Sequence, residues 1–175
     1  MISKVTKPFL FLFLLSTVSC KSQDLKTVAF VDLEKYSGKW YDIAHLPVSF
    51  MKGCECTSAD YAITNKGYVL VTNRCRKGDP AKWKSIQGKA FVVPNSNNSK
   101  LKVQFFWPFK GNYWIIELAD DYSYAVVGDK SRKYLWILSR KTRMDKKLYE
   151  EIIIRTGNKG FAVENLEISK HTDCD

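Results

Sequence analysis

The chain has 175 residues, of which 45% are hydrophobic and 14% aromatic, and its 28 Lys and Arg against 18 Asp and Glu give a formal net charge of +10. This apolar content is too high for a disordered basic tail, and the absence of a fixed-period repeat or sustained heptads excludes collagens, coiled coils and solenoids. No apolar run approaches the ~18–20 residues of a membrane-spanning helix, which excludes a polytopic membrane protein.

Residues 1–19 have the pattern of a secretory signal peptide. Lys4 and Lys7 form a basic region, residues 9–15 (FLFLFLL) form a short hydrophobic region, and small or polar residues follow up to Ser19. This order is typical of export peptides, and the hydrophobic region is too short for a membrane anchor. A buried N-terminal helix is the alternative.

Cys20 directly follows Ser19, and this junction resembles the cleavage box of bacterial lipoproteins, in which the cysteine is acylated and becomes the first residue. The match departs from the pattern at Thr17, where an aliphatic residue is preferred. Acyl chains such as palmitate contribute ~0.8 kcal/mol per buried CH₂, so several chains anchor a protein firmly. We expect residues 20–29 to form a lipidated tether to a membrane. A secreted protein with a leftover cysteine is the alternative.

The body of the chain alternates apolar and polar residues in short segments that are separated by turn signals. The clearest segment is residues 101–107, and the turn at 65–67 ends in a glycine, which suits a left-handed position. Eight strands are predicted in this way, at residues 38–46, 56–64, 68–75, 84–93, 101–107, 113–118, 123–128 and 134–140.

Eight consecutive antiparallel strands with short connections predict an all-β fold, an eight-stranded antiparallel up-and-down β-barrel. Closure of the barrel removes the exposed edges of an open sheet, and a barrel of this size can hold one small ligand. A sandwich is the main alternative.

The periodicity changes to that of a helix in the last third of the chain. Apolar residues recur at intervals of four from Met144 to Ile152, Asp145 is placed to cap the N-terminus, and Gly157 is placed to end the helix. We expect one C-terminal helix packed outside the barrel, followed by a short last strand at residues 161–168.

Four cysteines remain after Cys20, namely Cys54, Cys56, Cys75 and Cys174. An even number in an exported chain predicts two disulfides, with three possible connectivities. A zinc site is the competing interpretation, but the cysteines lack paired CxxC knuckles, and neither histidine has a ligand-like spacing. We expect no metal site.

Gly38-Lys39-Trp40 is a G-x-W motif at the start of the first strand, and residues 135–140 (LWILSR) close the eighth. Together with the strand number and the helix, these motifs resemble the lipocalin family over about residues 30–170, with bacterial outer-membrane lipocalins and apolipoprotein D as the nearest branches. The resemblance implies a lipocalin barrel domain at residues 30–175. It also implies that Trp40 crosses the closed end of the barrel beneath Arg140, in a structural cation–π contact of ~0.5–2 kcal/mol.

The resemblance to apolipoprotein D implies a disulfide between Cys56 and Cys174, which leaves Cys54 to pair with Cys75. A bond between Cys56 and Cys75, across the hairpin of the second and third strands, is the rival pairing.

The same resemblance implies a ligand pocket in which Asn73 is a polar group within an apolar wall, as is typical of small-molecule sites. Loop 47–53 would be a lid whose apolar residues contact an acyl chain or a membrane. Core packing without a cavity, and a loop that is simply packed on the barrel, are the alternatives. The expected ligand-binding residues are Tyr61, Asn73, Phe105, Trp107, Trp136, Phe50 and Met51.

The implied function is the binding, storage or transport of a small lipophilic ligand, such as a fatty acid or lysophospholipid, by an outer-membrane lipoprotein of a bacterial envelope. We expect no catalytic residue and no cofactor, because no nucleophile motif is present and Asp120 and Asp121 lie in a turn. A lipocalin-type enzyme and a structural envelope protein without ligand are the alternatives. Nucleic acid is not expected as a partner, because the basic residues are dispersed.

Overall fold

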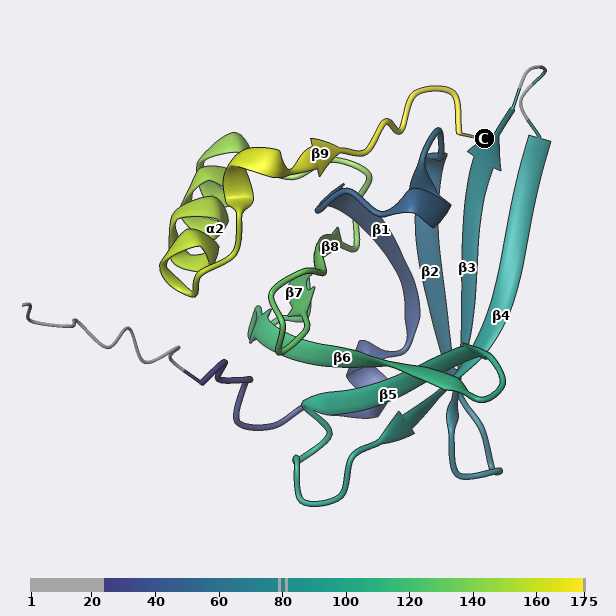
Figure 1. The fold of residues 1–175 in the computed structure, drawn as a ribbon, viewed down its shortest axis with the longest axis vertical. Helices are drawn as coiled ribbons and strands as arrows, with labels where there is room; N and C mark the ends of the chain where they lie inside the picture. Colours follow the sequence, from purple (N-terminus) through teal and green to yellow (C-terminus); the bar gives the residue numbers. More distant parts are fainter. Residues whose placement is uncertain (1–23, 79, 81, 175) are drawn as a thin grey trace, which may run out of the picture.

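The computed structural model describes residues 24–78, 80 and 82–174. Its main feature is one antiparallel sheet rolled into a barrel (Figure 1), in the order β2-β3-β4-β5-β6-β7-β8-β1, which closes by pairing of β1 with β2. This confirms the predicted barrel over the sandwich. The strands are β1 (Gly38–His45), β2 (Glu55–Ile63), β3 (Val69–Lys77), β4 (Lys82–Val92), β5 (Lys100–Phe106), β6 (Phe109–Leu118), β7 (Tyr124–Gly128) and β8 (Leu135–Ser139).

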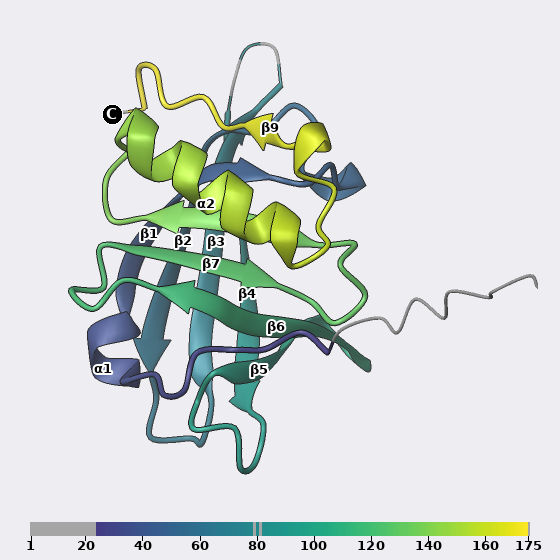
Figure 2. The same cartoon turned by 90° about the vertical axis from the view of Figure 1, so that its left-hand side faces the viewer.

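The connections alternate between two ends of the barrel, because each strand reverses the direction of the one before. The closed end holds the start of β1, the 93–99 and 119–123 connections and the end of β8. The other end, here called the mouth, holds the 46–54 loop with its 3₁₀ helix η1 (Ser49–Met51), the β5–β6 turn and the β7–β8 connection. In Figure 2 these three mouth segments lie along the right-hand edge of the view.

A short helix that the periodicity did not predict, α1 (Leu33–Tyr36), covers the closed end. Asp32 caps it, because its carboxylate accepts hydrogen bonds from the backbone N–H groups of Glu34 and Lys35. The helix turns the chain into β1 and buries Tyr36.

Helix α2 (Lys146–Asn158) packs outside the barrel, as predicted, and Asp145 caps it by accepting from the N–H of Leu148 at 3.0 Å. The predicted terminator was wrong: Gly157 lies inside the last turn, and Gly160, with a φ of +86°, takes the left-handed position after it. Ile152 is fully buried beneath the helix.

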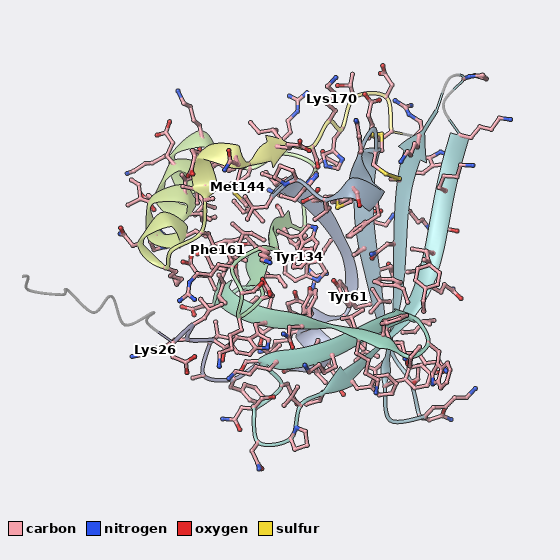
Figure 3. All side chains as sticks on the ribbon, viewed as in Figure 1. Lys26, Tyr61, Tyr134, Met144, Phe161 and Lys170 are labelled. Atoms are coloured by element: carbon pink, nitrogen blue, oxygen red, sulfur yellow. A yellow bond between two sulfur atoms is a disulfide. The ribbon has the colours of Figure 1, made fainter. Side chains whose placement is uncertain are left out.

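The predicted strand at 161–168 is only partly present. Phe161 packs under α2 (Figure 3), where Gly128 leaves room for its ring, because a Cβ at Gly128 would lie 2.7 Å from it. A 3₁₀ helix, η2 (Val163–Asn165), then redirects the chain, and only β9 (Glu167–Ile168) pairs, with the mouth half of β1.

The barrel therefore has an interior core and a second core between its outer face and α2. The N-terminal segment completes the second core: Leu25 is buried in it, and the N–H of Val28 donates to the carbonyl of Ile115. The packed chain thus begins ahead of residue 30. The predicted signal peptide, residues 1–19, and Cys20 lie outside the described residues. Within the part that is described, no helix has the length and apolar character to cross a bilayer.

Candidate ligand-binding site

Trp40 forms the floor of the barrel at the closed end. Its side chain is fully buried, and its indole N–H donates to the carbonyl of Tyr36 at 2.8 Å. The guanidinium carbon of Arg140 lies 3.8 Å from the centroid of the indole, in the contact that the resemblance implies. Arg140 also donates to the carbonyls of Lys35 and Lys39, so it fastens α1 and the start of β1 to the end of β8.

Three tyrosines from different elements lie above Trp40 and join their hydroxyl groups in a chain. The Tyr113 hydroxyl lies 2.7 Å from that of Tyr36 and 2.8 Å from that of Tyr61. Burial raises the pKa of each phenol, that of Tyr61 to about 12, so all three are neutral and hydrogen-bonded at physiological pH. Figure 3 shows Tyr61 inside the ring of strands. The closed half of the interior is therefore filled, and its polar groups are satisfied.

The mouth half of the interior is covered less completely. Ala59, Asn73 and Ile86 form one cross-strand row on the same face as the buried Val71, and all three remain partly exposed. The ring of Phe105 lies over Gly88, where a Cβ would come within 2.7 Å of it. Solvent thus reaches wall positions that would be sealed in a filled core.

Two polar atoms in this half have no protein partner among the described residues. The side-chain oxygens of Asn73 and Thr57 are buried and accept no hydrogen bond there. An unpaired acceptor is costly in a dry core, because it loses its hydrogen bonds to water. These atoms are available to a donor group on a bound molecule or to water.

The lid loop contributes one inward and one outward residue. The indole N–H of Trp136 lies 3.4 Å from the sulfur of Met51, and Trp136 stacks on Tyr134 with 6.1 Å between ring centroids. Phe50, in contrast, is 65% exposed. Met51 therefore closes over the wall, whereas Phe50 points into solvent.

Trp107 lies outside the barrel, although a strand was predicted over residues 101–107 and the resemblance implies that Trp107 is a ligand-binding residue. The strand ends at Phe106, which pairs with Phe109 across a two-residue turn, and Trp107 lies in this turn with 87% of its surface exposed. Alternation fixes the direction of a side chain only while the strand continues. The structure thus brings Tyr61, Asn73, Phe105, Trp136 and Met51 to the interior and leaves Trp107 and Phe50 outside it.

Two disulfides lie at the mouth end. Cys54 is bonded to Cys75, and Cys56 to Cys174, which is the pairing that the resemblance implies rather than the rival across the hairpin. The second bond fastens the C-terminal tail to β2. The mouth is therefore held by covalent links where the closed end is held by packing.

A buried polar cluster beside the mouth was missed in the sequence, although Asp42 and His45 interrupt an apolar stretch of β1. The imidazole Nδ1 of His45 lies 2.6 Å from the Asp42 carboxylate, and Ser169 donates to the same oxygen at 2.5 Å. Burial lowers the pKa of His45, but Asp42 and then Glu167 outweigh this effect and raise it overall. The cluster borders a cavity of about 200 Å³ and ties the segment after β9 to β1.

This cluster resembles a catalytic triad in composition but not in geometry. The Ser169 hydroxyl bonds to the carboxylate, and it lies 3.4 Å from the imidazole nitrogen that is already engaged with Asp42, so no base is placed to activate it. Among the described residues, no group of three His, Cys, Asp or Glu side chains is arranged to hold a metal ion.

A family model described as a lipocalin-like domain matches residues 31–171. The chain is 37% identical over 145 residues to outer membrane lipoprotein Blc of Vibrio cholerae, which covers 82% of this chain and 85% of that protein. It is 31% identical to temperature-induced lipocalin-1 of Arabidopsis thaliana (87% and 86% covered) and 33% identical to bovine apolipoprotein D (82% and 78%). Among solved structures, insecticyanin of the tobacco hornworm Manduca sexta superimposes with a TM-score of 0.70 at 20% identity, over 86% of each chain.

Proposed function

The chain belongs to the lipocalin family, and from this premise we propose that the mouth half of its barrel binds the apolar part of an amphipathic lipid. Members of this family generally bind small hydrophobic molecules rather than catalyse reactions. The ligand class would be a fatty acid, a lysophospholipid or a similar molecule. Its storage or transport would be the role of the protein in a bacterial envelope.

The incomplete cover of the mouth-half wall carries this proposal. Phe105, Trp136 and Ile86 present apolar surface that is still reached by solvent, whereas the floor below them is filled. Each CH₂ group of a chain that displaces this solvent contributes ~0.8 kcal/mol, so a long acyl chain binds without any catalytic group.

The residues of the proposed site divide by role. Tyr61 would form the base on which the end of the chain rests, Phe105 and Trp136 the apolar wall, and Asn73 the acceptor for a donor on the ligand. Met51 would cover the bound chain. Phe50 and Trp107 lie outside the wall and have no part in the proposed contacts with the chain.

We also propose that the protein is a lipoprotein that is acylated at Cys20 and held at the outer membrane. The names of the Vibrio cholerae and Escherichia coli relatives support this, as does the lipoprotein-like junction after Ser19. Incorporation of labelled palmitate by the wild-type chain but not by Cys20→Ser tests the proposal. Equal labelling of both chains, or labelling of neither, would contradict it.

A matched pair of charge substitutions tests the binding site. Ile86→Glu places a carboxylate on the inner face of β4, and Gln87→Glu places the same charge one residue further, on the outer face. With a dansyl-labelled fatty acid as probe and lysophosphatidylcholine as neutral competitor, we expect Ile86→Glu to weaken binding at least about tenfold, because a charge opposes the buried chain. Gln87→Glu should bind as the wild type does. The proposal would be rejected if the wild type showed no saturable binding of either lipid.

A further inference from the structure

The turn between β5 and β6 carries apolar side chains that neither core uses. Phe106, Trp107 and Phe109, here called the aromatic tip, are 68%, 87% and 77% exposed. Single exposed apolar residues are ordinary, but a contiguous group of large aromatic side chains on one turn marks an interaction site. None of the three belongs to either hydrophobic core. Packing of the barrel therefore does not explain why large aromatic residues stand at these positions.

The aromatic tip lies on the same side of the molecule as other exposed or chain-end features. Phe50, which is 65% exposed on η1, belongs to a second mouth loop along the same edge of Figure 2. The described chain also begins toward this edge in Figure 2, and its second residue, Leu25, is buried in the core outside the barrel.

Cationic side chains accompany these aromatic residues. Lys110 adjoins the aromatic tip and Lys52 follows η1, while Lys130 and Lys133 lie on the β7–β8 connection, and all four are exposed. None of them is ion-paired to a carboxylate within the described part of the chain.

The carboxylates of the same region are engaged elsewhere. Among the described carboxylates, Glu55 faces Arg76 and Lys170, Glu167 faces the imidazole of His45, and Asp129 is buried, where it accepts hydrogen bonds from Ser131. The mouth face therefore combines protruding aromatic rings with unneutralised positive charge.

We propose that the mouth face docks on an anionic lipid bilayer, with the aromatic tip inserted at the interface and the lysines beside lipid phosphates. Trp and Phe favour the boundary between headgroups and acyl chains, and basic side chains near the surface are attracted to anionic lipids. Exposed aromatic rings beside positive charges without carboxylate partners match an anionic membrane surface in both apolar and electrostatic character. The docking depends neither on acylation of Cys20 nor on a bound ligand.

An acyl anchor at Cys20 would also hold the mouth face close to the bilayer. Cys20 precedes Asp24 by four residues, which span at most about 14 Å when extended. An acylated chain would hold the mouth close to the bilayer, so anchoring and docking would favour one orientation.

The test uses the chain from Lys21 to Asp175, which lacks Cys20 and therefore any acyl group at that residue. Residues 24–174 contain every strand of the barrel, both cores and both disulfides, so this chain is the folded unit. Flotation with vesicles of equal phosphatidylglycerol and phosphatidylcholine should show saturable binding. We expect weaker binding to phosphatidylcholine alone and loss of the difference as salt rises from about 0.05 M to about 0.5 M.

The variant Phe106→Ser/Trp107→Ser/Phe109→Ser should lower vesicle binding at least about tenfold, because three large apolar side chains no longer enter the interface. Phe30→Ser is the matched control, since Phe30 is 60% exposed and its neighbour Val31 bonds to Asn97 at the closed end. The control should bind as the wild type does. Lys52→Gln/Lys110→Gln should weaken binding to anionic vesicles by about fivefold per charge and leave binding to phosphatidylcholine unchanged.

Depth of insertion gives a second measurement. Brominated lipids should quench Trp107, so Trp107→Phe should keep vesicle binding while the quenching disappears. Quenching that is undiminished in Trp107→Phe would show that Trp107 does not enter the bilayer and would overturn the proposal. Equal vesicle binding by the triple serine variant and the wild type would do the same.

Self-association is the competing use of this face, and sedimentation separates the two. A wild type that forms dimers and fails to bind vesicles, with a monomeric triple variant, would assign the aromatic tip to a second copy of the chain and reject docking on a bilayer. The triple variant should still bind the dansyl-labelled fatty acid, so a failure of docking and a failure of ligand binding are distinguishable.

Discussion

The two ends of the barrel are built from the same eight strands but are stabilised differently. At the closed end, Trp40 and the three-tyrosine chain fill the interior, and Arg140 fastens the surrounding backbone. At the mouth, interior side chains remain partly exposed, and the chain is held by two disulfides and the Asp42–His45 pair. Packing thus stabilises the closed end, whereas covalent and charged links stabilise the mouth, where apolar interior groups remain partly exposed.

The largest expected difference in stability between the two ends is that between alanine substitutions of Trp40 and Trp136. Trp40→Ala should lower the free energy of unfolding by about 3–5 kcal/mol, because it empties a fully buried site. Trp136→Ala, at the partly buried wall, should lower it by only about 1–2 kcal/mol. Urea unfolding followed by far-UV circular dichroism measures both.

If Trp40→Ala does not fold, Trp40→Phe provides the comparison, since it keeps an aromatic ring and loses the bond to the Tyr36 carbonyl. Equal destabilisation by the alanine variants at positions 40 and 136 would mean that the ends do not differ as described.

Removal of a disulfide should give the next largest loss of stability. Replacing Cys56 and Cys174 by serine should cost about 2–4 kcal/mol, because the unfolded chain gains the freedom of a loop with a sequence separation of 118. The matched variant without Cys54 and Cys75 opens a separation of only 21, and chain entropy predicts a loss smaller by about 1.5 kcal/mol. The measurement is thermal unfolding under oxidising conditions, and the reverse order would contradict the entropic account.

The hydroxyl chain should give a smaller effect. Tyr113→Phe leaves the hydroxyls of Tyr36 and Tyr61 without their shared partner and should lower stability by about 1–2 kcal/mol. Tyr61→Phe removes only the terminal bond and should cost less. Unfolding in urea compares them, and a neutral Tyr113→Phe would show that the chain does not stabilise the floor.

The smallest expected effect is the pH dependence of the mouth. The folded-state pKa of His45 lies above its unfolded value, so protonated His45 adds stability that is fully present below about pH 6.5 and is lost as pH rises through the raised pKa. Unfolding measured from about pH 6 to about pH 8.5 should show this decline. His45→Gln should flatten the profile, whereas His171→Gln, which leaves the Asp42–His45 pair intact, should keep it.

Most of the architecture was predictable from the sequence, because the strands are set by local alternation and by turns that lie within a few residues. The eight strands appear where they were predicted, with shifted ends, and Asp145 caps the predicted helix. Helix α1 was missed because four residues are too few to establish a period. Trp107 was wrongly predicted to lie in the fifth strand, because this strand ends at Phe106.

The candidate site was predictable only in part, and the reason is chain distance. The Asp42–Ser169 bond joins residues 127 positions apart, and the Tyr36–Tyr113 bond joins residues 77 apart, so no local pattern marks either contact. The same holds for the choice of Gly160 over Gly157, since the end of α2 depends on where Phe161 must pack.

The sequence by itself determined a barrel with a G-x-W floor, an external helix and four cysteines for two bonds. Only the tertiary structure decided which end is filled, which polar groups meet, and that the aromatic tip points away from the interior. Alternation fixes which face of a strand a residue occupies, but burial depends on what the rest of the chain brings to that face. Closure of the sheet supplies those partners at the floor and leaves them incomplete at the mouth.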